Sequence, residues 1–147
     1  MKRMLFTIVA AAVSLLAFTG AASAQSNLDV RASVPFSFVV DNHVLPAGDY
    51  QITQLRPTLI VLHNADTAKS ATALTLFDRP EKGATGNPAL IFHRYGNEYF
   101  LAQVIANNTQ EARQLLTSSA EKKLSKEQGM PQLAIVRISG EKTKSGD

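Results

Sequence analysis

The segment that most restricts the fold is a pair of apolar runs separated by two turn residues. Ala89–Tyr95 and Glu98–Ile105 are rich in β-branched and aromatic residues, and Gly96-Asn97 stands between them. Two such runs around a Gly-Asn pair are typical of a β-hairpin, in which Gly96 supplies the positive φ of a type II′ turn. We therefore expect a hairpin over Ala89–Ile105, in the middle of a small β-structure.

A two-residue loop also predicts which hairpin residues face one another: Tyr95 with Glu98, Arg94 with Tyr99, His93 with Phe100, and Phe92 with Leu101. Strict alternation then gives one face Ile91, His93, Tyr95, Phe100, Ala102 and Val104. It gives the other face Leu90, Phe92, Arg94, Tyr99, Leu101 and Gln103. Because both faces are largely apolar, neither is expected to lie fully open to water.

Residues 1–24 have the pattern of a secretory signal peptide. Met1-Lys2-Arg3 is a positive start, Leu5–Phe18 is an apolar run, and Ala22-Ser23-Ala24 fits a small-residue cleavage site. The alternative is a membrane anchor, but the run has about 14 residues, fewer than the roughly 20 that a transmembrane helix needs. We expect cleavage after Ala24 and a periplasmic or secreted protein that does not span the membrane afterwards.

Charge and cysteine content exclude several classes of function. Of the 15 Lys and Arg residues, Lys2 and Arg3 belong to the leader, so the remainder nearly balances the 12 Asp and Glu residues. This balance gives no electrostatic case for a nucleic-acid partner. The chain has no Cys, hence no disulfide and no thiolate chemistry, and the exported domain must rely on packing alone.

Alternating apolar residues and turn residues predict further short strands. Leu28–Val40 is apolar at every second position, and Pro35 predicts a kink there, so that this segment serves two sheets or two sides of a barrel. The continuous apolar run Leu59–His63 predicts a buried strand. Other strands are expected at Tyr50–Leu55, Ala71–Phe77 and Leu133–Ile138.

One helix is expected near the C-terminus, with two competing capping boxes as its start: Asn108 with Glu111, or Ser118 with Glu121. The second is preferred and predicts a helix over about Ser119–Gln128, ended by Gly129. Its apolar stripe would be narrow, with Leu124 and Ala120 as the residues that hold it on the surface of the domain.

These elements together predict a mainly β fold, namely a small antiparallel β-sandwich or barrel of about seven strands with one short C-terminal helix. We expect a single β-domain over residues 25–138, a length that suits one hydrophobic core. Residues 139–147 hold no large apolar side chain and are expected to form a flexible C-terminal tail.

Two segments carry a specific pair of motifs. Val34–Val40 reads VPFSFVV and is followed by LPAGDY at Leu45–Tyr50, while Phe92–Leu101 reads FHRYGNEYFL. The pair resembles a family of small exported bacterial proteins with a VPFxFxV…LPAGxY opening and an FHRYGxxYFL centre, over roughly the whole mature chain. The resemblance implies export and a shared fold, and no particular activity, ligand or catalytic residue. That family often has Pro near position 117, which supports a helix start at Ser118, but Thr117 departs from this pattern and leaves a longer helix open.

The sequence contains no reactive constellation of a known kind. His43, His63 and His93 lie in separate expected elements at spacings that match no compact metal-ligand motif, so no metal and no other cofactor is expected. There is no Gly-x-Ser-x-Gly and no phosphate-binding glycine loop. We therefore do not expect an enzyme.

The densest group of polar and aromatic side chains lies near the hairpin turn and comprises His93, Arg94, Tyr95 and Tyr99. The Arg94 guanidinium can stack on the Tyr99 ring, a contact worth roughly 0.5–1 kcal/mol when exposed. In one interpretation these residues only staple the turn end of the hairpin. In the other they form a hairpin-tip surface that binds a ligand or partner.

The function expected from these observations is that of an exported, soluble, non-catalytic β-domain that binds a partner protein or a component of the cell envelope. The alternative is a small-molecule carrier that holds an apolar ligand inside a barrel. An open interior of about 300 Å³ or more would favour the carrier, whereas a filled core leaves only surfaces for binding.

Overall fold

The computed structural model describes residues 28–84, 87–106 and 111–138. The expected signal peptide at 1–24, the start of the expected domain at 25 and the expected tail at 139–147 lie outside these residues. So does Asn108, the cap of the competing helix start.

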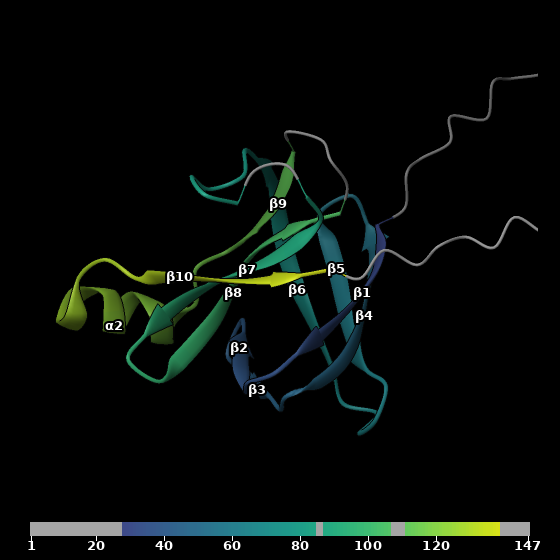
Figure 1. The fold of residues 1–147 in the computed structure, drawn as a ribbon, viewed down its shortest axis with the longest axis horizontal. Coiled ribbons are helices and arrows are strands. Elements are labelled where there is room, and N and C mark those ends of the chain that lie inside the picture. Colours follow the sequence, from purple (N-terminus) through teal and green to yellow (C-terminus); the bar gives the residue numbers. More distant parts are fainter. Residues whose placement is uncertain (1–27, 85–86, 107–110, 139–147) are drawn as a thin grey trace, which may run out of the picture.

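The described chain consists of ten strands and one helix (Figure 1). The elements are β1 Asp29–Val34, β2 Phe38–Val40, β3 His43–Leu45, β4 Gly48–Arg56, β5 Leu59–Asn64, β6 Ser70–Asp78, β7 Ala89–Tyr95, β8 Glu98–Ile105, β9 Ala112–Leu115, α2 Ser119–Gln128 and β10 Gln132–Arg137. The expected mainly β fold with one short helix near its C-terminal end is confirmed. The expectation of about seven strands was too low, because it missed the three short strands β2, β3 and β9 as separate elements.

The strands form one continuous sheet that folds over on itself without closing into a barrel. Its order is β1-β4-β5-β6-β9-β8-β2-β3, and β7 and β10 extend it from β8. β6 belongs to both halves, because residues 70–74 pair with β5 and residues 75–78 pair with β9. Among the described strands, β2 and β8 run parallel where Val39 lies beside Phe100, and the other pairs are antiparallel. The architecture is therefore an open sandwich.

The kink expected at Pro35 is present and divides the N-terminal segment between the two halves. β1 ends at Val34 and pairs with β4, whereas β2 begins at Phe38 and pairs with β3 and β8. Because proline cannot donate a ladder hydrogen bond, the break falls where the chain leaves one half for the other.

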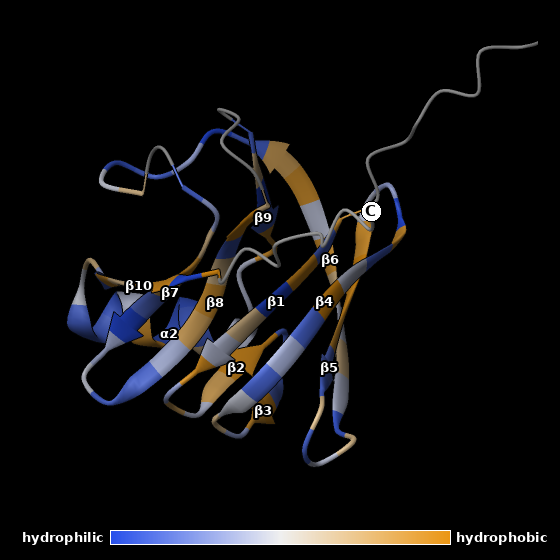
Figure 2. Cartoon of the chain, turned by 45° about the vertical axis from the view of Figure 1, so that its right-hand side comes forward, coloured by the Kyte–Doolittle hydropathy of each residue, from blue (hydrophilic) through white to orange (hydrophobic). Residues whose placement is uncertain are grey.

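The interior between the two halves is filled with apolar side chains. Tyr50, Ile52, Ile60 and Leu62 from β4 and β5 meet Phe38, Leu90, Phe92 and Val104 from the other half. The Phe38 ring lies edge-on to Tyr50, at 5.1 Å between centroids, and to Phe92, at 5.3 Å. This apolar interior follows from the sequence pattern of the strands, because hydrophobic and hydrophilic residues alternate along β1 and β4 (Figure 2).

One expectation about an individual strand was wrong, and one strand was not expected. β5 is buried on one face only, with Ile60, Leu62 and Asn64 inside and His63 exposed, although its apolar run is continuous. β9 was not expected at all, because Ala-Arg-Gln-Leu has no strand signal; pairing with β6 and β8 overrides that local preference.

The helix has the expected limits. Ser118 is its N-cap, with Oγ accepting a hydrogen bond from the Glu121 N–H at 3.1 Å, and Gly129 ends it with a φ of +81°. The expected contact stripe was wrong, because Ala120 is exposed, Leu124 is half-buried, and the buried residue of α2 is Glu121.

We predict that Gly48→Ala destabilises the protein more than Gly83→Ala. Both glycines have positive φ, +152° and +97°, so both substitutions strain the backbone. A Cβ at Gly48 would lie 2.7 Å from Nδ2 of Asn64, which is fully buried and whose Oδ1 accepts from the Asp66 and Thr67 N–H groups, whereas a Cβ at Gly83 meets nothing within 4 Å. In urea denaturation, the free energy of unfolding of Gly48→Ala should be about 1–3 kcal/mol lower than that of Gly83→Ala, which is the usual cost of overpacking. Equal losses would contradict the close approach.

Candidate functional site

A β-bulge in β8 decides which side chains share a face with His93. The register pairs Ile91 with Gln103 and Phe92 with Leu101, which leaves Ala102 as an extra residue. Beyond the bulge, Val104 packs in the main core and Gln103 joins the face of His93. Strict alternation therefore assigned Val104 and Gln103 to the wrong faces, whereas the four residue pairs predicted next to the turn are confirmed. The turn also fits the predicted type II′ geometry, with a φ of +60° at Gly96.

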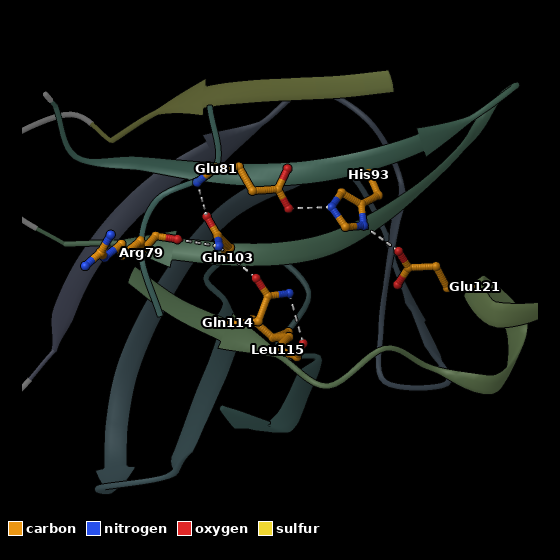
Figure 3. Close-up of polar contacts among 7 residues, drawn as sticks. All are labelled: Arg79, Glu81, His93, Gln103, Gln114, Leu115 and Glu121. Carbon is orange, nitrogen blue, oxygen red and sulfur yellow. Dashed lines mark hydrogen bonds and ion pairs between the residues drawn. The ribbon is translucent and has the colours of Figure 1, made fainter. Parts of the chain in front are cut away.

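Gln103 holds the segment after β6 against the sheet (Figure 3). Its Oε1 accepts from the Glu81 N–H at 3.0 Å, and its Nε2 donates to the Arg79 carbonyl at 3.0 Å and to Gln114 Oε1 at 2.7 Å. Gln103 is only 1% exposed, so these bonds replace the water that its amide gave up on burial. The network fixes the backbone from which the Glu81 side chain extends.

His93 lies between two carboxylates from different parts of the chain (Figure 3). Its Nε2 is 2.7 Å from Glu81 Oε1, and its Nδ1 is 2.5 Å from Glu121 Oε1. Glu81 comes from the segment after β6 and Glu121 from the first turn of α2. We call Glu81, His93 and Glu121 the carboxylate–histidine clamp, because the imidazole of β7 joins both segments to the hairpin.

The electrostatics of the clamp favour a charged imidazole. Burial lowers the pKa of His93, but hydrogen bonds and negative charge from Glu121 and Glu81 together raise it more, so the pKa lies above its ordinary value. Burial also raises the pKa of Tyr95, and the charges of Glu121 and Glu81 add to that rise. Tyr95 therefore stays a neutral phenol beside the clamp.

His93 and Tyr95 are among the site residues predicted from the sequence, whereas Glu81, Gln103 and Glu121, which share their face, are not. Glu121 had been expected as half of a capping box, and its N–H does bond to Ser118, while its carboxylate turns toward His93. One signal for Gln103 was available: an amide in the middle of an apolar strand must find partners when it is buried.

The other two predicted site residues lie on the opposite face of the hairpin. Arg94 lies over the Tyr99 ring, 5.5 Å from its centroid, as the predicted pairing requires, and its Nε donates to the Gly96 carbonyl at 2.7 Å. The Tyr99 ring also stacks on Phe36, at 3.8 Å between ring centroids. The four predicted residues thus form two pairs on two faces rather than one continuous surface.

A groove of about 350 Å³ lies at the tip of the hairpin, where β2, β3 and the start of α2 come together. Its lining is Ser37, Phe38, Val39, Asn42, Val44, Asn97, Glu98, Tyr99, Phe100 and Ala120. Val44 is 69% exposed and contributes an apolar side chain to the lining. Of the four predicted site residues, only Tyr99 lines this groove, which we call the hairpin-tip groove.

A second hollow, of about 510 Å³, lies on the outer face of β1, β4 and β5. Most of the residues that line it are polar or charged, such as Ser33, Asp49 and His63. The His63 Nδ1 is within hydrogen-bond distance of Ser70 Oγ, at 2.8 Å. This hollow contains none of the residues predicted for the site.

The three histidines lie on three different strands, β3, β5 and β7. In residues 28–84, 87–106 and 111–138, no group of three His, Cys, Asp or Glu side chains is placed to hold a metal ion. The clamp does not qualify because its two carboxylates approach opposite nitrogens of one ring (Figure 3).

Comparison with models of known protein families, with curated proteins and with solved structures gave no match for this chain. Within the part of the chain that the structure describes, no helix has the length and apolar character needed to cross a membrane.

We predict that Gln103→Met destabilises the protein by about 1–3 kcal/mol, because it leaves the part-buried Glu81 N–H and Arg79 carbonyl without the partner that Gln103 supplies. Gln51→Met is the matched control, since the Gln51 amide donates to Asp29 in an exposed setting at 3.0 Å and its loss should cost less than about 0.5 kcal/mol. Urea denaturation of both variants measures the difference. A loss at Gln103 no larger than that at Gln51 would show that the network does not hold the segment.

Proposed function

We propose that this chain is an exported, non-catalytic β-domain that binds a partner protein or a component of the cell envelope through the hairpin-tip groove. The main support for the proposal is the groove itself, where apolar and hydrogen-bonding side chains of the hairpin meet those of β2, β3 and α2. Exposed Val44 offers apolar contact, and Asn42, Asn97 and Glu98 offer polar groups in the same lining. Protein-binding sites usually combine apolar contact area with polar groups of this kind.

The filled interior favours this proposal over a small-molecule carrier. Tyr50, Phe38 and Phe92 are each no more than 1% exposed, and their rings pack edge-on across the middle of the sandwich. A ligand inside the sandwich would have to displace these rings. The hairpin-tip groove needs no such rearrangement.

The engagement of His93 favours a non-catalytic role. A general base needs a ring nitrogen that is free to accept a proton from a substrate. Both ring nitrogens of His93 are within 2.7 Å of a carboxylate oxygen, so neither is presented to a substrate in this arrangement.

Substitution of Val44 tests the groove. Val44→Glu places a charge in the groove without disturbing the core, and Leu55→Glu is the matched control, because Leu55 is 63% exposed and lies outside the groove. Native mass spectrometry of the protein recovered from its own cell envelope should show a bound subunit or envelope fragment with wild type and Leu55→Glu, and a loss of about tenfold or more with Val44→Glu. Equal retention by all three proteins would exclude the groove, and a retained small apolar molecule would favour the carrier.

Export has its own test. The leader pattern at residues 1–24 predicts that the protein recovered from the producing cells begins at Gln25. Intact-mass measurement of the periplasmic and cytoplasmic fractions should find the shortened chain in the periplasm. Full-length protein in the cytoplasm alone would contradict export.

A further inference from the structure

The geometry of the clamp sets a proton requirement when both of its carboxylates are ionised. An ionised carboxylate only accepts hydrogen bonds, and each ring nitrogen of His93 is within hydrogen-bond distance of a different carboxylate, at 2.5 and 2.7 Å. Both contacts are satisfied together only if both nitrogens carry a proton. A neutral imidazole has one N–H, so its other nitrogen would direct a lone pair at a carboxylate oxygen.

Among the described residues, the hydrogen-bond partners of the His93 ring are the carboxylates of Glu81 and Glu121. Glu81 approaches from the segment after β6, Glu121 from α2, and Tyr95 lies two residues along β7 on the same face. The cross-strand neighbours on β8 and β10 are Phe100 and Leu133, which do not titrate. The nearest lysines in sequence to the two carboxylates, Lys82 and Lys122, are exposed.

We propose that the carboxylate–histidine clamp is controlled by a proton: the protonated ring of His93 ties both α2 and residues 79–84 to the central hairpin, and loss of the proton breaks one of these two ties. The Glu81 side chain is 28% exposed and that of Glu121 only 7%. Glu81 therefore reaches water at little cost. In the neutral ring, the one remaining N–H is expected to stay on the nitrogen that faces the more buried Glu121. If it does not, α2 must move so that water can reach the Glu121 carboxylate. The inference does not depend on the proposed partner, because it concerns only how these elements are held together.

The direction of the pH effect follows from the raised pKa of His93. Stability that comes from the protonated ring is fully present below the ordinary histidine pKa of about 6.5 and is lost as pH rises through the higher folded-state pKa. The contacts of α2 and residues 79–84 should therefore weaken as the pH rises above the ordinary histidine pKa.

Hydrogen exchange from about pH 6 to about pH 9, corrected for the intrinsic pH dependence of exchange, measures this release. The protection of amides in α2 or in residues 79–84 should fall with pH relative to amides of β4. In His93→Gln the protection should not change with pH, because glutamine does not titrate. His63→Gln, an exposed histidine on β5, should behave as wild type. The proposal would be overturned if the protection of these amides changed with pH in the same way in wild type and in His93→Gln.

A second variant distinguishes the clamp from a general loss of stability. In Glu81→Gln the amide can donate an N–H to the bare nitrogen of a neutral His93, so the clamp should persist at about pH 9 with protection above that of wild type. Protection lower than that of wild type at this pH would contradict the proposal.

Nitrogen-15 shifts of the wild-type ring test the same point without any substitution. Both nitrogens of His93 should be protonated at about pH 6, with one proton lost as the protection falls. One bare nitrogen already present at about pH 6 would overturn the proposal.

Discussion

The single extra residue in β8, Ala102, sets the arrangement on which the rest of the hairpin depends. A bulge reverses the alternation beyond it, so Val104 enters the core and Gln103 turns to the face of His93. There the buried amide finds the backbone of Arg79 and Glu81, which brings the Glu81 carboxylate to the imidazole. With regular alternation Gln103 would point into an apolar core without partners, and the segment after β6 would lose the bonds that hold it.

The two faces of the hairpin make different kinds of contact. On one face the clamp joins α2 and residues 79–84 to β7 through charged hydrogen bonds, which are stronger than neutral ones but depend on protonation. On the other, Arg94 and Phe36 contact the Tyr99 ring at the edge of the hairpin-tip groove. Ala120, in the first turn of α2, lines that groove, and Glu121 next to it belongs to the clamp. The helix start is thus the element that both features share.

Local signals were sufficient for those elements whose formation depends on neighbours in sequence. The Gly96-Asn97 pair gave the turn and the residue pairing beside it, Pro35 gave the break between β1 and β2, and Ser118 with Gly129 gave the limits of α2. β9 could not be found in this way, because it is a strand only where β6 and β8 lie on either side of it. The bulge could not be predicted from the sequence either, because no residue near Ala102 marks it.

Side-chain period, turn residues and caps within a few positions were enough to predict strands with a buried face, a tight hairpin and a short capped helix. The same local pattern predicted His93 and Tyr95 on one face of the hairpin and Arg94 and Tyr99 on the other. The meeting of Glu81 and Glu121, 12 and 28 positions from His93, with its two ring nitrogens is visible only in the folded chain. That meeting depends on the direction in which distant segments pack against the sheet, and nothing within a few residues of His93 encodes it.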